Sequence, residues 1–281
     1  HFLVPERALG HMRQAAGRGA GLEQAWKEKL EACRRAHPEL AASLESALSG
    51  QLPSGWDADL PAFKPEDGQV ATRAASGKAL SALAKRIPSL IGGSADLASS
   101  NNSLIQGSGD FLKGRHGERN IRWGIREHAM CGACNGMALH GGVRPYAASF
   151  FIFTDYARPA IRLAAMMGLP VIYIMTHDSI GLGEDGPTHQ PIEHLAALRA
   201  MPGLCIIRPA DANETVAAWR VATQRTEGPT MLILTRQGLP VLDRTRAAGA
   251  EGLPRGAYVL SQEKGAKPGA VLIGSGSEVA V

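Results

Sequence analysis

The residues from Thr176 to Glu193, THDSIGLGEDGPTHQPIE, concentrate the side chains of this chain that are best suited to chemistry. Two histidines, two aspartates and two glutamates lie within these eighteen residues. The segment directly follows PVIYIM, an apolar run typical of a buried parallel strand, and open α/β sheets bind ligands just beyond such strands. Gly181, Gly183 and Gly186 let the backbone turn tightly and approach a ligand. We therefore interpret the segment as an active-site loop rather than an ordinary surface loop.

Polar side chains also follow other apolar runs of the sequence. Asp96 comes after SLIGGSA, Glu127 after NIRWGIR and Arg236 after TMLILT, while His177 and Asp178 follow the run described above. The carboxyl ends of parallel strands share one edge of a sheet, so we expect these side chains to meet in one crevice. This placement predicts a functional site that is built from several strands.

Apolar runs alternate with helical patterns from about residue 70 to residue 240. The expected strands are SLIGGSAD, NIRWG, PYAASFFIF, PVIYIM, LCIIRP and TMLILT, and helical stretches such as ATRAASGKALSALAKRI and NETVAAWRVATQR lie around them. This alternation predicts an α/β fold in which a parallel sheet is flanked by helices. Upstream, EQAWKEKLEACRRAHPELAASLESALSG has helical periodicity up to Gly50, which predicts a helical N-terminal linker. Downstream, AVLIGSGSEVAV is expected to begin a further α/β domain with its first strand.

The composition argues against several classes of protein. The 281 residues are 44% hydrophobic and 20% charged, and their net charge of +4 comes without a basic run of the kind that binds nucleic acid. No apolar run is long enough to span a membrane. Cys131 and Cys134 lack the second ligand pair of a structural zinc site, so we expect reduced thiols on a packed helix, no bound metal, and a cytoplasmic protein. The sequence begins without Met, which suggests a fragment or a processed chain.

Seven segments of the sequence match one family of enzymes in order and spacing. They are ATRAASG (71–77), GGSADLASSN (92–101), RNIRWGIREHAM (119–130), FFIFTDYAR (150–158), THDSIGLGEDGPTHQPIE (176–193), RPADANE (208–214) and LTRQ (234–237). Together they resemble transketolase, a family of thiamine diphosphate enzymes. The resemblance implies that residues 66–245 form a pyrimidine-binding α/β domain of the thiamine diphosphate-binding type. Residues 1–65 would be a helical linker from a missing diphosphate-binding domain, and residues 246–281 a linker and the first strand of a truncated C-terminal domain.

The resemblance makes Glu127 a catalytic residue that also binds the cofactor. A carboxyl group hydrogen-bonded to a ring nitrogen of the aminopyrimidine favours the imino form, whose nitrogen takes the proton from C2 of the thiazolium. Phe150, Phe153 and Tyr156 are assigned to packing around the same ring, although their spacing alone predicts core residues.

The resemblance also assigns the sugar-binding residues. Asp185 is expected to contact the hydroxyl group next to the ketose carbonyl, and His189 to lie beside the reacting carbonyl, with His177 as a further catalytic residue. Arginine suits a terminal phosphate because its guanidinium forms forked, charge-assisted hydrogen bonds. The residues that match the phosphate-binding positions of the family are Arg73, Ser100, His177 and Arg236.

The implied reaction transfers a two-carbon ketol unit from a ketose phosphate to an aldose phosphate in the pentose phosphate pathway, with thiamine diphosphate as the cofactor. Mg²⁺ would be held by ligands in the missing upstream domain, and a homodimer would carry the cofactor at its subunit interface. Because no diphosphate-binding motif is present, we expect the chain to be inactive alone. Dihydroxyacetone synthase, a split transketolase subunit and a non-catalytic assembly module remain as alternatives.

Overall fold

The computed structural model describes residues 3–263, 265 and 267–280. It divides into two compact units, one up to Gln51 and one from Leu52 onward. The first unit consists of two helices, α1 (Glu6–Ala36) and α2 (Pro38–Ser49), so the predicted helical N-terminal region is confirmed.

The boundaries of α2 follow from its terminal residues. Pro38 begins the helix, because the first helical position needs no backbone donor, and Gly50 ends it in the left-handed conformation with φ 70°. An ion pair between Arg34 and Glu45, at 2.6 Å, joins the two helices. The sequence pattern did not reveal the break between them at His37, because helical periodicity continues on both sides.

The second unit is built on a six-stranded sheet in which neighbouring strands are parallel, in the order β3-β2-β4-β5-β7-β6. These strands coincide with the six apolar runs of the sequence, so the predicted parallel α/β sheet is confirmed. A separate antiparallel pair joins β1 to β8. The strands are β1 (Gln69–Ala71), β2 (Leu90–Ser94), β3 (Asn120–Arg122), β4 (Arg144–Phe150), β5 (Ile172–Thr176), β6 (Cys205–Ile207), β7 (Thr230–Leu234) and β8 (Gly238–Pro240).

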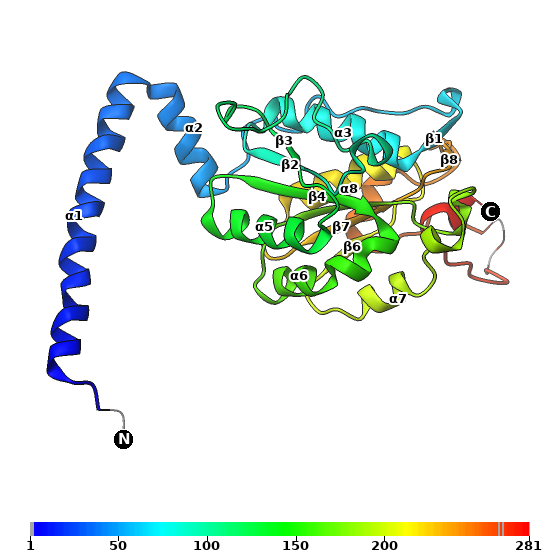
Figure 1. Cartoon of the computed structure of the whole chain (residues 1–281). Helices are drawn as coiled ribbons and strands as arrows, with labels where there is room; N and C mark the ends of the chain where they lie inside the picture. The colour runs from blue at the N-terminus through cyan, green and yellow to red at the C-terminus, as the bar shows by residue number, and fades with distance from the viewer. Residues whose placement is uncertain (1–2, 264, 266, 281) are drawn as a thin grey trace. The chain divides into compact units, whose positions relative to one another are not determined.

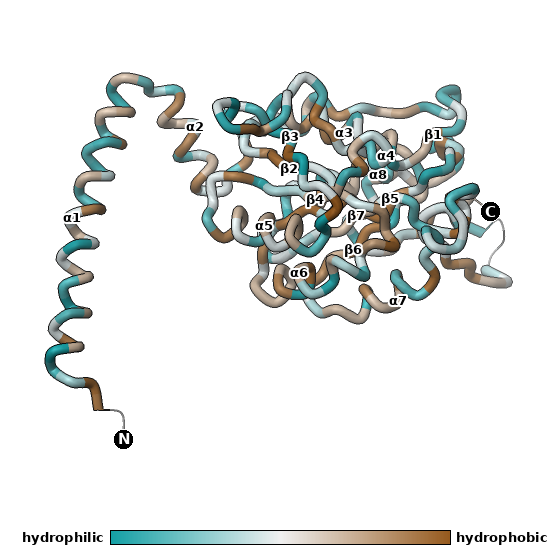
Figure 2. The backbone as a smooth tube through the Cα atoms, viewed as in Figure 1, coloured by the Kyte–Doolittle hydropathy of each residue, from teal (hydrophilic) through white to brown (hydrophobic). Residues whose placement is uncertain are grey.

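Helices cover both faces of the six-stranded sheet (Figure 1). Side chains alternate between the faces along each strand. In β5, Ile172 and Ile174 pack towards α3 and α8, whereas Tyr173 and Met175 pack towards α5, α6 and α7. Figure 2 accordingly shows hydrophobic segments along the strands. The helices are α3 (Thr72–Arg86), α4 (Ala98–Asn101), α5 (Glu127–His140), α6 (Thr154–Met166), α7 (His194–Arg199) and α8 (Ala212–Gln224).

The thiols of Cys131 and Cys134 are buried on the core face of α5. All four cysteines are free, and burial raises the pKa of Cys134 to about 12. A thiol is reactive or metal-binding as its thiolate, so burial makes these two residues packing elements. This agrees with the prediction of reduced thiols on a packed helix.

The segments that flank the α/β body pack back onto it. Trp56 and Leu60 contact the core beneath α3 and α8, and Arg244 pairs with the buried Asp211 at 2.9 Å. The first strand that was expected within residues 270–281 is not formed among residues 270–280, which the structure describes. Residues 271–273 have no regular structure, and the side chain of Leu272 is 95% exposed. A strand requires a neighbour for its backbone hydrogen bonds, and no described strand pairs with this run.

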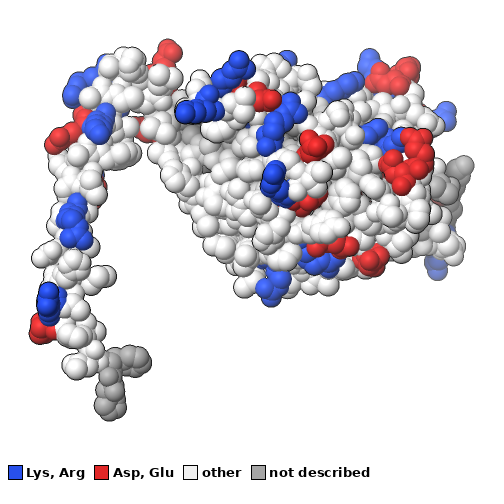
Figure 3. All heavy atoms as spheres, viewed as in Figure 1, with Lys and Arg blue, Asp and Glu red and all other residues white. Residues whose placement is uncertain are grey.

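Among the described residues, no helix is long and apolar enough to cross a membrane. On the face drawn in Figure 3, basic and acidic side chains are interspersed rather than gathered into one basic stripe.

Candidate active site

The predicted site residues lie on the segments that follow the strands at their carboxyl ends. α4 with Ser100 follows β2, Glu127 begins α5 after β3, and the segment after β4 carries Phe153. His177 directly follows β5, and Arg236 lies two residues beyond the end of β7. Because all six strands are parallel, these segments share one edge of the sheet, as the sequence predicts.

A cavity of about 390 Å³ opens at this edge. All five residues predicted for the substrate other than His189 contribute to its wall, together with Phe150, which was predicted for the cofactor. Ser99 also lines it and was missed by sequence reasoning, where its only signal was its place beside Ser100. The complete lining is Arg73, Ser99, Ser100, Phe150, His177, Asp185 and Arg236.

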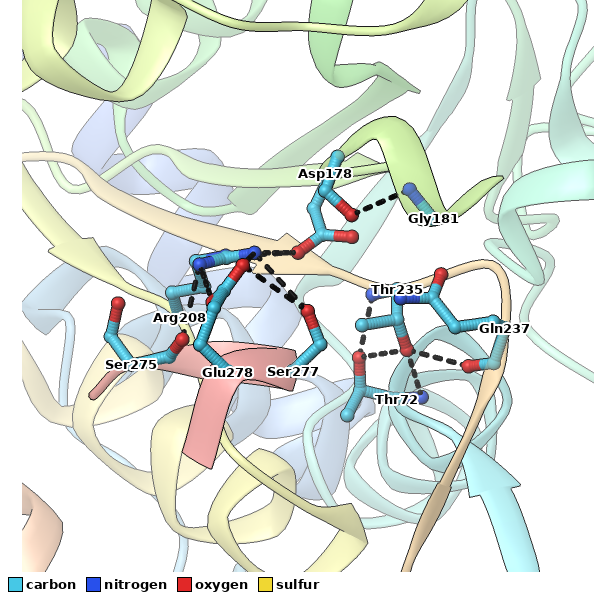
Figure 4. Close-up of polar contacts among 10 residues, drawn as sticks. Thr72, Asp178, Gly181, Arg208, Thr235, Gln237, Ser275, Ser277 and Glu278 are labelled. Carbon is cyan, nitrogen blue, oxygen red and sulfur yellow. Dashed lines mark hydrogen bonds and ion pairs between the residues drawn. The ribbon is translucent and has the colours of Figure 1, made fainter. Parts of the chain in front are cut away.

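Two threonines that bond to one another, Thr72 and Thr235 (Figure 4), precede the two cavity arginines in the chain. Thr72 at the start of α3 and Thr235 after β7 bond side chain to side chain at 3.1 Å, and each side chain also accepts the backbone N–H of the other. Both threonines are fully buried, so the adjacent Arg73 and Arg236 are held beside one another. Burial and the charge of Arg236 lower the pKa of Arg73, which indicates a cationic pair suited to an anion.

Each arginine is further oriented by a backbone carbonyl. Arg73 Nη1 donates to Ser100 O at 2.7 Å, and Arg236 Nη1 donates to Leu182 O at 3.0 Å. Arg236 also pairs with Glu184, which lies on the exposed loop. An anionic ligand would therefore have to displace the carboxylate of Glu184 from the guanidinium of Arg236.

His177 is held in an unusual conformation at the base of the cavity. Its φ is 60°, a left-handed value that costs energy for a side chain of this size, and it is only 2% exposed. The imidazole stacks on Phe150 with ring centroids 3.6 Å apart, and its Nε2 lies 3.9 Å from Asp185 Oδ2. Burial, helped by the charge of Arg73 and opposed by Asp185, lowers the pKa of His177 to about 4. The ring is therefore neutral at pH 7.

Asp96, Glu127 and Asp178 do not line the cavity, which corrects the expectation that all the polar residues after the strands would converge there. The carboxylate of Asp178 is fully buried and pairs with Arg208 Nη2 at 2.7 Å (Figure 4). Arg208 also donates to Ser275 O and pairs with Glu278, so it ties the loop after β5 to the C-terminal segment. Asp96 is exposed on the turn before α4. Successive residues beyond a strand point in different directions, so adjacency in sequence does not place them in one pocket.

Aromatic rings extend the site beside the cavity. Phe150 and Phe153 stack nearly parallel at 5.9 Å, with Tyr156 a further 6.1 Å from Phe153 and 65% exposed. His189, which does not line the cavity, points its ring edge-on at Phe153 at 5.4 Å. Glu127, which is 7% exposed, lies next to Ser149 near the end of β4. Within the described part of the chain, the hydrogen bond that its Oε1 accepts is a long one, from Ser149 at 3.5 Å.

A second group of titratable residues, Asp155, Glu193 and His194, lies on α6 and at the start of α7. Asp155 faces His194 Nε2 at 3.0 Å, and Glu193 faces the opposite nitrogen, Nδ1, at 3.8 Å. Because the two carboxylates face opposite nitrogens of one imidazole, they orient the ring from both sides. This arrangement does not suit three ligands around one metal ion.

Comparison with known proteins assigns this architecture to a family. Residues 68–241 match the family described as the pyrimidine binding domain of transketolase. The chain belongs to the transketolase family. All ten predicted site residues lie within this matched region.

Transketolase relatives match almost the whole chain. It is 56% identical over 279 residues to the transketolase of Geobacillus stearothermophilus, which covers 99% of this chain and 42% of that protein. A transketolase from Pichia stipitis, solved in complex with sedoheptulose 7-phosphate, superposes with a TM-score of 0.87 at 42% identity, covering 93% of this chain and 39% of that one. A split gene transketolase, described as an inactive beta4 tetramer, gives a TM-score of 0.51 at 31% identity, covering 63% and 55%. The chain therefore spans less than half the length of the first two relatives.

Proposed function

We propose that this chain supplies the pyrimidine-binding and sugar-binding half of a transketolase active site. Together with a diphosphate-binding part, it transfers a two-carbon ketol unit from a ketose phosphate to an aldose phosphate. The observation that carries the proposal is one cavity that joins a cationic pair, Arg73 and Arg236, to the neutral His177 and to the stacked ring of Phe150.

The residues beside the cavity fit the aminopyrimidine ring of thiamine diphosphate. Phe150 and Phe153 offer parallel aromatic faces, and Glu127 offers a buried carboxyl group whose internal hydrogen bond is long. When bound, the cofactor supplies the carbon nucleophile for ketol transfer. Glu127 would hold a proton at the ring nitrogen, the phenylalanines would exclude water, and Tyr156 would border the ring.

The sugar would lie across the cavity with its phosphate at the arginines. Arg73 and Arg236, with Ser100, would bind the phosphate, as the charge of this end of the cavity favours. Asp185, His177 and His189 would hydrogen-bond the hydroxyl and carbonyl oxygens at the reacting end, with the two histidines as catalytic residues. The Pichia stipitis relative that was solved with a sugar phosphate supports this substrate class.

The remaining requirements of the reaction point to other chains or segments. Mg²⁺ and the diphosphate would be held by a diphosphate-binding part, because the acidic group at His194 does not suit chelation. We infer a homodimer with the cofactor at the interface, supported by exposed apolar side chains on α5 and α6 such as Leu139, Leu163 and Met166. We place the reaction in the pentose phosphate pathway and, from the free cysteines, in the cytoplasm.

A split transketolase subunit is the second candidate. The relative described as an inactive tetramer of a split gene transketolase favours a chain that needs a complementary partner for activity. The cationic pair favours phosphorylated substrates, which is compatible with both transketolase and dihydroxyacetone synthase, because only the acceptor of the synthase, formaldehyde, lacks a phosphate. A non-catalytic assembly module would have no use for a cavity of this composition.

A coupled assay with xylulose 5-phosphate, ribose 5-phosphate, thiamine diphosphate and Mg²⁺ tests the proposal. We expect no turnover by the chain alone and turnover when the diphosphate-binding part of the Geobacillus stearothermophilus relative is supplied. The Glu127→Gln variant in the same mixture is expected to be inactive. A complex that assembles but does not turn over would refute the proposed function and favour the assembly module.

A further inference from the structure

A buried series of polar side chains runs beneath the strand ends and stops at His177. It begins at Ser94 at the end of β2, continues through Asn101 at the end of α4, and reaches Thr176 at the end of β5. Ser94, Asn101 and Thr176 are each at most 3% exposed. None of these three residues lines the cavity, and the ligand-contacting roles proposed above do not use them.

The direction of each hydrogen bond in this series is set by Asn101. Ser149 O is a carbonyl and can only accept, so the group facing it at 3.1 Å must be the amide Nδ2 of Asn101. The other proton of Nδ2 is donated to Thr176 Oγ1 at 2.7 Å. The amide oxygen then faces Ser94, whose hydroxyl donates to it at 2.6 Å.

The hydroxyl of Thr176 then determines which ring nitrogen of His177 carries the proton. It accepts from Asn101 and has one proton of its own, and the neighbouring His177 Nδ1 lies 2.9 Å away. If Thr176 donates that proton, Nδ1 is an acceptor and carries no hydrogen. The pKa of His177, lowered to about 4 by burial and by Arg73, leaves the ring a single proton at pH 7, which then resides on Nε2.

We propose that Asn101 and Thr176 are positioning residues that hold His177 as its neutral Nε2–H tautomer. Nε2 is the nitrogen that faces Asp185 in the cavity, so the site gains an uncharged N–H donor for a phosphate, hydroxyl or carbonyl oxygen. The opposite tautomer would present a lone pair to Asp185 and to any such oxygen, which is repulsive. The identity of the ligand rests on the proposed function, whereas the tautomer is a property of the chain alone.

A second Thr–His pair, at residues 188–189, shows what Asn101 contributes to the contact at residues 176–177. Thr188 Oγ1 lies 2.9 Å from His189 Nδ1, so the same pair of residue types makes the same contact. Thr188 is exposed, and the described hydrogen bonds include no amide donor to its hydroxyl. The tautomer of His189 is therefore left to solvent and ligand, whereas that of His177 is fixed by buried partners.

The tautomer can be read by NMR on the purified protein labelled with ¹⁵N-histidine, with the His177 signals assigned by their loss in His177→Gln. We expect wild-type Nδ1 to resonate as an unprotonated nitrogen and Nε2 as a protonated one. Thr176→Val should give a mixture of tautomers, and Thr176→Ser should restore the wild-type pattern. Asn101→Asp should invert it, because a carboxylate takes the Thr176 proton and leaves the hydroxyl to accept from Nδ1–H.

Thr230→Val is the matched control, since Thr230 is a buried strand threonine whose hydroxyl makes no hydrogen bond with the residues that the structure describes. It should leave the His177 signals unchanged. A wild-type spectrum with Nδ1 protonated would overturn the inference without any variant, and so would an unaltered spectrum of Thr176→Val.

A kinetic measurement separates positioning from general stability. In the complemented enzyme, Thr176→Val should raise the KM for the sugar phosphate about tenfold, as expected for one weakened hydrogen bond to a charged group, and Thr176→Ser should recover it. An unchanged KM in Thr176→Val would contradict the role. A protein that lacks turnover but holds the Nε2–H tautomer would refute the proposed function alone, and an active protein with Nδ1–H would refute this inference alone.

Discussion

The guanidinium of Arg236 binds a backbone carbonyl and also a carboxylate that would compete with a bound phosphate. It donates to Leu182 O and pairs with Glu184, whose side chain is 78% exposed and free to move away. A sugar phosphate would replace Glu184 on the same group. At the scale of single residues, the affinity for phosphate therefore depends on both partners.

We predict that Arg236→Ala raises the KM for phosphorylated sugars about 10-fold to 100-fold, because a charge-assisted bond is lost, while kcat changes little. Glu184→Gln is the matched variant and should lower the KM, since it weakens the competitor. Steady-state kinetics of the complemented enzyme measure both. Equal KM values in wild type and Arg236→Ala would exclude Arg236 from phosphate binding.

The neutral state of His177 has a consequence for stability. Its folded pKa of about 4 lies below the ordinary value of about 6.5, so between these values the unfolded chain binds more protons. The stability contributed by the neutral ring is present above pH 6.5 and is lost as the pH falls towards 4.

We predict that wild type loses about 1–2 kcal/mol more unfolding free energy between pH 7 and pH 5 than His177→Asn does. Asparagine tolerates the positive φ at this position and does not titrate. Urea unfolding at the two pH values measures the difference. Parallel pH dependence of the two proteins would show that His177 does not titrate as described.

The residues of the candidate site were predicted unevenly from sequence. Arg73, Ser100, His177, Asp185 and Arg236 were found through family motifs, and the structure brings them to one cavity. Asn101 and Thr176 gave no signal, although they lie within the same motifs, because their importance depends on buried contacts between three strands. The different directions of His177 and Asp178 were equally hidden, since they depend on a left-handed residue that the sequence does not mark.

At the scale of elements, Arg208 connects the loop after β5 to the segment Gly276–Ala280. Its side chain is 8% exposed and that of Asp178 is fully buried, whereas Glu278 on the same guanidinium is 54% exposed. Burial raises the pKa of Asp178 and Arg208 opposes that rise, so the carboxylate depends on its partner.

We predict that Arg208→Met destabilises the fold by about 3–5 kcal/mol, because it leaves a buried carboxylate unpaired. Glu278→Gln removes the exposed partner of the same arginine and should cost less than about 1 kcal/mol. Urea denaturation of the two variants beside wild type provides the comparison. Similar losses in both would mean that the buried pair with Asp178 contributes no more than the exposed one.

The elements themselves were predictable to the extent that local patterns specify them. Six apolar runs became six strands, of which the four inner ones, β2, β4, β5 and β7, are almost fully buried between helices, whereas the edge strands β3 and β6 are only partly buried. The apolar run at 271–273 did not become a strand, since strand formation also requires a neighbouring strand, which no local pattern encodes. The break at His37 was not predicted, because the residues on both sides of Pro38 continue one helical pattern.

At the scale of the whole molecule, the exposed apolar side chains on α5 and α6 indicate a surface that a second chain would cover. Leu163 and Met166 are 49% and 64% exposed in a chain of 29.6 kDa. We predict a mass of two chains by light scattering and a shift towards one chain in Met166→Lys. Gln224→Lys on α8, which covers the other face of the sheet, should remain dimeric. A wild-type protein that stays monomeric at micromolar concentration would contradict the proposed homodimer.

The measurement that tests the central claim most directly is the exchange of the C2 proton of thiamine diphosphate for deuterium, followed by NMR in the complemented assembly. Glu127 is proposed to promote this proton transfer before any sugar binds, so exchange isolates the contribution of this chain. We predict rapid exchange with wild type and a loss of at least about 100-fold with Glu127→Gln, with cofactor still bound. Equal exchange rates in the two proteins would contradict the assignment of this site as the cofactor-activating half of a transketolase.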